Sequence, residues 1–317
     1  MATIGKKVSR YSKLERKDFP FVYLLILLPV AQFLVFWLYV NASSIALAFQ
    51  DSAGKFTPKF DNFKTVYKAF IHQDIFGINL GNSLKRSFIL WIAGELLCFP
   101  VSLITTYVLT RKIVGHYIFR VCYIVPSLMG AIIWTLLIKE MVAVEGPVTH
   151  LLQTWGVELP RRAEHSGLLA AEETAFITIL CIKIIMGFIG NNAVLTGAYT
   201  RVPTELFESA QLDGADFGTE LFMIAIPCIS PTICTLLTFS LCSIFTCDYN
   251  VFLLTEGNYE TSTIGFQLFN LTRLLSTGGT SDYNYPAALG LVLTIFTMPV
   301  VLLGKYLLEK VFTNVEV

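Results

Sequence analysis

Long apolar runs separated by short polar segments dominate the chain. About 20 apolar residues are needed to cross the hydrocarbon core of a bilayer, and such a segment is helical because lipid offers no partner for unpaired backbone amides. Six runs meet this requirement, at about residues 19–50, 87–108, 121–138, 174–199, 229–254 and 287–308. The pattern predicts an all-α, polytopic membrane protein with six transmembrane helices.

Composition agrees with an assignment to the membrane. Hydrophobic residues make up 54% of the chain, charged residues 15%, and the mean hydropathy is +0.64, whereas a soluble domain has roughly 45 to 50% apolar and about 25% charged residues. The formal net charge of zero argues against a nucleic-acid partner, which requires clustered excess Lys and Arg. The seven cysteines show no metal-ligand or redox spacing, so we expect neither a metal site nor a disulfide framework.

Positive charge predicts which side of the membrane each segment occupies. Residues 1–18 are polar and hold six Lys and Arg side chains, which is typical of a cytoplasmic lead and not of a cleaved signal peptide. A second concentration, Arg111-Lys112, follows the second run. By the positive-inside rule both termini are cytoplasmic, with the membrane domain at 19–312, a tail at 313–317 and the segment 201–227 on the cytoplasmic side.

That cytoplasmic segment has the pattern of two short helices joined by a turn. Pro203 suits a helix start, and Glu205 and Glu208 fall where the helix dipole favours negative charge. Gly214 accepts the positive φ of a sharp turn, so the first helix is expected to break there. A second helix can then run to Pro227 at the membrane. We expect a compact helix-turn-helix that inserts into a partner.

At these residues the chain resembles the membrane subunits of ATP-binding-cassette importers. Their cytoplasmic coupling loop reads E-A-A, two or three residues, G, nine residues, then I-x-L-P. Ser209 replaces one alanine and Ile226 replaces the leucine, and both changes preserve a helix. An ordinary polar loop, the alternative interpretation, would leave the spacing unexplained. The resemblance assigns ATPase coupling to Glu205, Glu208, Ser209, Ala210, Asp213, Gly214, Ala215, Ile224 and Pro227.

Further stretches are similar to the carbohydrate-uptake branch of these permeases, of the maltose and multiple-sugar type. They are Asn82-Ser83-Leu84, the turn 111–115, Pro126, Gly187-Phe188, Asp248 with the degraded motif 254–258, and the segment 285–288. The resemblance implies the architecture of a type I importer permease and a sugar or oligosaccharide as cargo. Because importers of other solutes share the coupling loop, a non-sugar solute remains an alternative.

The resemblance also implies partners. The chain contains no GxxxxGK[ST] phosphate loop, so we expect no enzyme activity, no catalytic residues and no cofactor in this subunit. ATP and Mg²⁺ would be bound by two partner ATPase subunits. A second homologous permease would complete the path through the cell membrane, and an extracellular solute-binding protein would dock on the outer loops 51–81 and 139–173.

Charged residues inside the predicted spans are costly in lipid and should face the interior of the bundle. In the functional interpretation, Asp248, Tyr249, Asn250 and Asn191 line the substrate path, where hydroxyl-rich sugars need carboxylate, amide and aromatic partners. In the structural interpretation, Asn191 forms a hydrogen bond between helices, and Asp248 caps or stabilises its own helix.

Glu95 and Lys183 are the other two charges within the predicted spans. They either pair to hold two helices together or, with Asp248, form the ion relay of a secondary transporter. The relay would leave the coupling-loop frame as coincidence. Secondary transporters also tend to show internal repeats of broken helices, and the two halves of this chain show no clear repeat.

Overall fold

The computed structural model describes residues 23–50, 60–72, 79–111, 115, 117–119, 121, 125, 129–277 and 283–312. These residues form α-helices and π-helices (η) and contain no β-strand, which confirms the predicted all-α class. The elements are η1 (Phe33–Tyr39), α2 (Val40–Ala48), α3 (Asp61–Ile71), α4 (Leu80–Ile92), η2 (Ala93–Cys98), α5 (Phe99–Thr110), α7 (Ala131–Met141), α8 (Pro147–Thr154), α9 (Arg161–Ser166), α10 (Glu172–Gly190), α11 (Asn192–Tyr199), α12 (Thr204–Leu212), α13 (Phe217–Thr219), η3 (Glu220–Ala225), α14 (Ile226–Cys228), α15 (Ser230–Thr246), α16 (Val251–Leu254), α17 (Ile264–Thr277) and α18 (Asn284–Phe312).

Within the part of the chain that the structure describes, four helical stretches are long and apolar enough to cross a membrane, so the chain is a membrane protein. They are Tyr23–Ala48, Leu80–Thr110, Glu172–Tyr199 and Asn284–Val311. A fifth, Phe217–Cys228 with Ser230–Thr246, is bent by 71°. Much of the predicted third span lies outside the described residues, which include its second half as α7. Six spans therefore stay a prediction, as do the N-terminal lead and the C-terminal tail.

The predicted fifth span is wrong at its far end. Its helix α15 stops at Thr246, and the next residues form a turn in which Tyr249 and Asn250 have φ of 54° and 62°. The Asp248 carboxylate accepts a hydrogen bond from the Asn250 amide at 3.2 Å, a local bond that competes with helix continuation. Asp248 therefore lies in a turn outside the helix.

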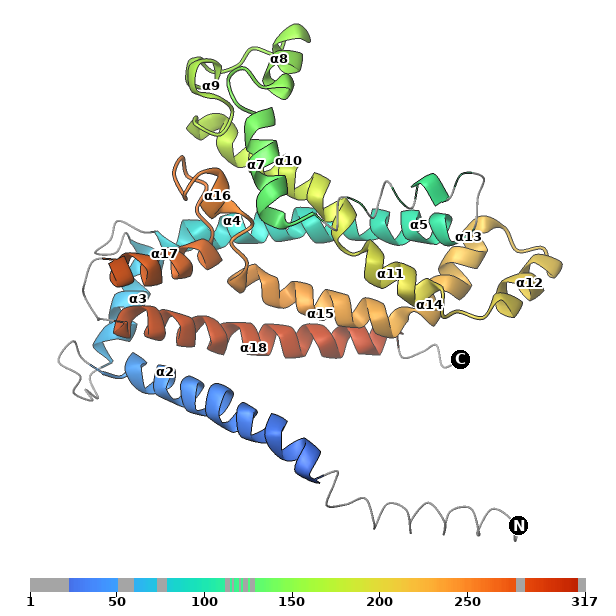
Figure 1. Cartoon of the computed structure of the whole chain (residues 1–317), viewed down its shortest axis with the longest axis horizontal. Helices are drawn as coiled ribbons and strands as arrows, with labels where there is room; N and C mark the ends of the chain where they lie inside the picture. Colours follow the sequence, from blue (N-terminus) through green and yellow to red (C-terminus); the bar gives the residue numbers. More distant parts are fainter. Residues whose placement is uncertain are drawn as a thin grey trace.

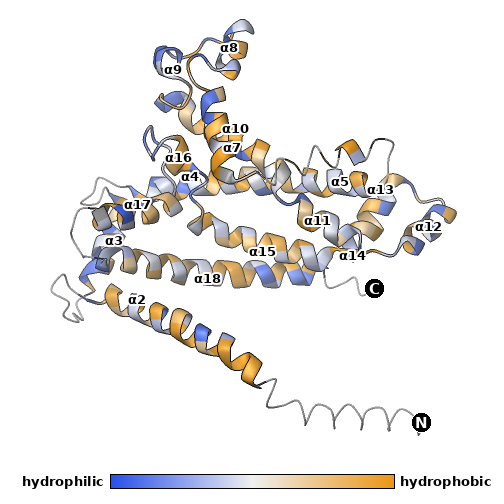
Figure 2. Ribbon diagram, viewed as in Figure 1, coloured by the Kyte–Doolittle hydropathy of each residue, from blue (hydrophilic) through white to orange (hydrophobic). Residues whose placement is uncertain are grey.

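The long helices lie side by side and place residues 201–227, named the coupling loop after the family motif that they resemble, at one end of the bundle (Figure 1). There α12 lies near the C-terminal end of α18, whereas α3 and α17 lie at the opposite end. Helix α15 packs against α18 and α4, and α10 packs against η2. Figure 2 shows the span that ends in α2 as strongly hydrophobic, while α9 and α12 carry more hydrophilic residues.

Candidate functional site

The coupling loop has the predicted helix-turn-helix form. Helix α12 ends at Leu212, and Gly214 adopts a φ of +82°. The Gly214 amide donates to the Gln211 carbonyl at 3.1 Å, and the Ala215 amide donates to the Ala210 carbonyl at 2.9 Å. These two bonds form a Schellman motif, which closes a helix on a residue in the left-handed conformation. The chain reverses at the glycine that the sequence singled out.

The second helix of the loop begins at an acidic cap. The Asp216 carboxylate accepts hydrogen bonds from the Thr219 amide at 3.1 Å and the Thr219 hydroxyl at 2.5 Å. These bonds, chiefly that of the hydroxyl, hold the pKa of Asp216 below its ordinary value. From there α13, η3 and α14 continue to Cys228 and include Ile224 and Pro227.

Helix α12 presents two different faces. Phe207 and Ala210 are buried against the bundle, whereas Glu205, Glu208 and Ser209 are exposed. Leu212, at the tip of the loop, is 90% exposed. A leucine so exposed beside glutamates gives the outward face a mixed apolar and acidic surface, which suits insertion into a cleft of another protein. Asp213 and Gly214 are also exposed.

The inward face of the loop is anchored by a charged cluster that sequence reasoning missed. Glu220 is only 4% exposed and forms an ion pair with Arg111 at the end of α5. The Tyr107 hydroxyl donates to the same carboxylate at 2.9 Å. The Arg111 guanidinium also lies 4.6 Å from the ring centre of Phe207 in α12. In the sequence, Glu220 is an acidic residue beside an apolar run, and Arg111 belongs to a basic turn that was used only to predict the orientation in the membrane.

The other end of the loop is fastened to the same helix. The Tyr199 hydroxyl, at the end of α11, donates to the Leu103 carbonyl of α5 at 3.2 Å. The ring centres of Tyr199 and Tyr107 lie 5.6 Å apart. An apolar cluster that includes Leu195 and Leu221 surrounds these contacts. Helix α5 therefore holds the coupling loop at its beginning and at its end.

The charged residues within the spans lie close together but form no direct ion pair. Glu95 in η2 hydrogen-bonds to Ser240 of α15, and its second carboxyl oxygen is buried without a partner. Lys183 in α10 lies with its ammonium nitrogen 5.1 Å from the ring centre of Tyr249. The Glu95 carboxylate and the Lys183 ammonium therefore attract each other across the packed helices η2 and α10 without forming a direct ion pair.

The four predicted path residues do not form one site. Tyr249 is buried under Lys183, while Asp248 and Asn250 are half-buried and share the turn after α15. Asn191 lies at the junction of α10 and α11, eight residues beyond Lys183, which is roughly 12 Å farther along the helix axis. The structure thus brings together Asp248, Tyr249 and Asn250 and leaves Asn191 apart.

The neighbouring Asn192 has a structural role. Its side chain accepts a hydrogen bond from the Thr106 hydroxyl at 2.7 Å and donates to the Phe188 carbonyl at 2.6 Å. It is 6% exposed. The bond from Thr106 ties the fourth span to the second, as polar residues do in helix packing within membranes, while the bond to Phe188 lies within the fourth span.

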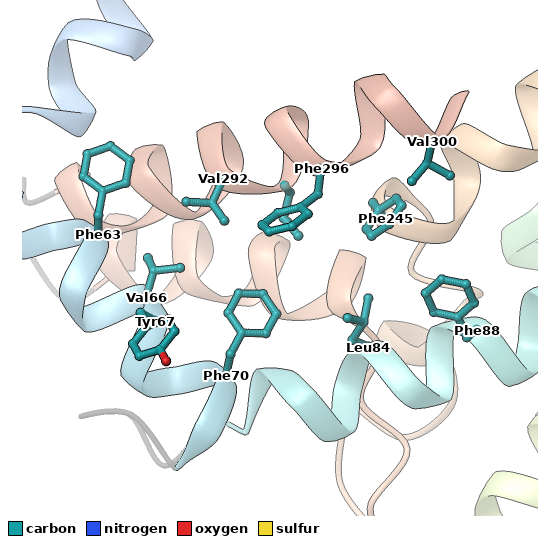
Figure 3. Close-up of a pocket in the computed structure, with 11 residues that line it drawn as sticks. Phe63, Val66, Tyr67, Phe70, Leu84, Phe88, Phe245, Val292, Phe296 and Val300 are labelled. Carbon is teal, nitrogen blue, oxygen red and sulfur yellow. The ribbon is translucent and has the colours of Figure 1, made fainter. Parts of the chain in front are cut away.

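A cavity of about 610 Å³ lies between α3, α4, α15 and α18. Figure 3 shows Phe70, Phe88, Phe245 and Phe296 around it, with apolar side chains on nearly every side. A hydroxyl-rich solute needs polar partners to replace its hydration. This cavity is therefore unsuited to bind a sugar, and the polar residues around Glu95 and Asp248 remain the better candidates for a path.

The chain is similar to importer permeases, although no protein-family model matches it. It is 27% identical over 283 residues to the arabinooligosaccharides transport system permease protein AraP of Bacillus subtilis, covering 87% of this chain and 84% of the relative. It is 23% identical over 231 residues to the multiple sugar-binding transport system permease protein MsmF of Streptococcus mutans, covering 72% and 74%.

The fold is likewise that of an importer. A solved bacterial ABC transporter involved in the import of the acidic polysaccharide alginate matches with a TM-score of 0.72 and 21% identity, over 95% of this chain and 99% of that chain. The same transporter type in complex with an alginate pentasaccharide-bound periplasmic protein matches with a TM-score of 0.70 and 22% identity, over 95% and 97%. In sequence and in fold the chain is therefore similar to permease subunits of ATP-binding-cassette importers.

Proposed function

We propose that this chain forms half of the translocation path of an ATP-driven importer for a sugar or oligosaccharide. The observation that carries the proposal is the coupling loop. Its inward face is fastened to α5 by Tyr107, Arg111 and Glu220, while its tip exposes Leu212 beside Glu208. A loop that is bonded to the bundle on one face and exposed on the other can bind a partner subunit and transmit its rigid-body movement to the bundle.

The partners follow from this role. ATP and Mg²⁺ are bound and hydrolysed by two ATPase subunits that dock on α12 from the cytoplasm, and this chain binds no cofactor itself. A second permease completes the path in the cell membrane, with both termini of each permease in the cytoplasm. A solute-binding protein delivers the cargo from outside, as the periplasmic protein seen with the alginate transporter suggests.

A saccharide cargo is supported by the names of two relatives and by the polar residues in the bundle. MsmF and AraP are named for multiple sugars and arabinooligosaccharides. Within the structure, Asp248 and Asn250 are half-buried and carry carboxylate and amide groups. Such groups match the hydroxyls of a sugar.

Transport by the assembled complex tests the proposal. The gently solubilised complex should contain two permeases and two ATPase subunits by mass measurement. Vesicles that contain it should take up labelled oligosaccharide only with ATP and binding protein present. Uptake driven by an ion gradient without ATP would instead support a secondary transporter that uses Glu95, Lys183 and Asp248.

A charge reversal on the exposed face of α12 gives the matched test of docking. Glu208→Lys should abolish ATP-driven uptake without lowering the amount of inserted protein, because the exposed side chain contributes little to folding. The control Glu164→Lys reverses another exposed acid, in α9 within the outer loop 139–173. The ATPase subunits should remain bound to the solubilised complex of this control, whereas they should be lost from that of Glu208→Lys. Normal uptake by the Glu208 variant would contradict docking at this face.

A further inference from the structure

The second span, Leu80–Thr110, hydrogen-bonds to the coupling loop at one end and to residues 262–264 at the other. It consists of α4, η2 and α5 and contains 31 residues, which corresponds to a length of roughly 46 Å. In Figure 1 it runs from the end of the bundle near α17 to the end near α13. The contacts at its two ends determine which movements this span can transmit.

At the coupling-loop end, the contacts are charged and buried. Tyr107 and Arg111 hold the carboxylate of Glu220, which begins η3, and Arg111 also covers the ring of Phe207 in α12. An ion pair with a hydrogen bond to the same carboxylate fixes direction as well as distance. A displacement of α12 or η3 therefore cannot occur without a displacement of α5, unless these bonds break.

At the opposite end, the same span holds the segment of residues 251–277, which contains α16 and α17. The Ser83 hydroxyl lies 3.0 Å from the Ser262 hydroxyl, and the Ser87 hydroxyl accepts a hydrogen bond from the Ile264 amide at 2.9 Å. Ser83 and Ser87 are buried, with 1% and 0% exposure. On the rim of this contact, Arg86 forms an ion pair with Glu260 at 2.7 Å.

Between its ends the span is packed closely against α10. A Cβ atom added at Gly94 would lie 3.0 Å from the Lys183 side chain, and one added at Gly187 would lie 2.8 Å from the Cys98 sulfur. Small residues at these positions let the two helices approach closely. The span is therefore supported along its length and can move as a body with α10.

We propose that the second span is the mechanical link that carries movement of the coupling loop to the segment 251–277 at the opposite end of the bundle. The inference rests on the proposed function, because the coupling loop moves only if an ATPase docks on it. It adds to the direct movement of the fourth and fifth spans, which are continuous with the loop. Coupling of this kind is carried by a contiguous network of packed and hydrogen-bonded residues. It is tested by substitutions that interrupt this network.

Hydrogen exchange in the complete importer provides the test. The purified complex of permeases and ATPase subunits is compared with and without a non-hydrolysable ATP analogue. In the unmodified protein, the analogue should change amide exchange both in residues 204–212 and in residues 260–271. Absence of any response in 204–212 would argue against the proposed docking function itself, independently of the link.

The decisive variant removes both charges of the buried pair, Arg111→Met with Glu220→Gln, because removing only one would leave an unpaired buried charge. We expect the response in 204–212 to persist and that in 260–271 to be lost. The control is Lys305→Met with Glu309→Gln, an exposed pair within α18, which should retain both responses. A normal response in 260–271 in the decisive variant would overturn the proposal.

A second variant removes the contacts of the second span at the end away from the coupling loop. It tests the proposed link even if the first variant does not assemble. Ser83→Ala with Ser87→Ala removes the two hydroxyl contacts to residues 262 and 264, far from the ATPase. The expected result is again a retained response in 204–212 and a lost response in 260–271. Retention of both responses would show that the segment 251–277 follows the loop by another route.

Discussion

At the scale of single residues, Gly214 sets the shape of the coupling loop. Its φ is +82°, and no heavy atom lies within 4 Å of where a Cβ would be. A side chain there is opposed by backbone conformation alone, at a cost of about 1–3 kcal/mol for a β-branched residue. Gly214→Val should therefore insert normally but lose ATP-driven uptake while ATP hydrolysis continues, as measured with vesicles that contain the complete importer.

The matched control is Gly197→Ala in α11. This glycine also has open space around it, but its φ is not positive, so the substitution should leave uptake unchanged. Uptake by Gly214→Val at the level of this control would show that transport does not need the turn. A loss of inserted protein would show that the turn stabilises the fold.

Asp216 gives a prediction about the cap of the second helix of the loop. Its hydrogen bonds to Thr219 lower its pKa below 3.8. Because the folded-state pKa is lowered, the cap contributes fully above the ordinary pKa, and its contribution is lost as the pH falls through the lowered pKa. At neutral pH, Asp216→Ala should speed amide exchange at Thr219, whereas Asp216→Asn still accepts the bonds. Equal exchange in all three proteins would contradict the role of the cap.

These residues differ in how visible they were in the sequence. The turn at Gly214 and the helix start after Pro203 were predictable, because backbone preferences of glycine and proline are encoded locally. The ion pair of Arg111 with Glu220 was not, since it joins two segments whose proximity depends on how the spans pack. Local pattern identifies a turn but does not identify the partner of a buried charge.

At the scale of elements, the contact between α10 and η2 depends on a glycine. A Cβ at Gly187 would lie 2.8 Å from the Cys98 sulfur, so Gly187→Ala should destabilise the protein by about 1–3 kcal/mol through overpacking. Gly190→Ala, near the end of the same helix with no atom within 4 Å, is the control. Thermal unfolding in detergent should show a lower midpoint for the first variant only; equal midpoints would contradict close packing.

The fifth span shows where element boundaries escape a hydropathy pattern. The apolar run 229–254 predicted one continuous helix, but α15 ends at Thr246. The bend at Ile229 coincides with the predicted start of the span. Pro227 and Pro231 lie close to the bend, where proline interrupts helical hydrogen bonding. The turn at Asp248 was signalled by an Asp and an Asn within three residues, both of which favour turns, although the surrounding apolar residues masked it.

At the scale of the whole molecule, the membrane class was predictable because hydropathy alone decides it. The all-α fold and the helix-turn-helix shape of residues 201–227 are confirmed, since both depend on local composition and spacing. Coupling of this segment to an ATPase stays a prediction. The packing of the spans was not predictable: apolar residues fill lipid-facing and buried positions alike, so nothing in the run 80–110 marks Ser83 and Ser87 as buried contacts to residues 262–264. Such contacts depend on the tertiary arrangement.

The orientation of the molecule in the membrane is the remaining prediction at this scale. Leu212 in the coupling loop is 90% exposed and Trp155 after α8 is 76% exposed, so a cysteine at either position is accessible to a thiol reagent. Ala210, at 9% exposure, is too buried to report accessibility. In a protein without its native cysteines, an impermeant thiol reagent added to intact cells should label Trp155→Cys and not Leu212→Cys. After the membrane is permeabilised, both should be labelled. Labelling of Leu212→Cys in intact cells would place the coupling loop outside, where no ATPase can reach it, and would contradict both the orientation and the import mechanism.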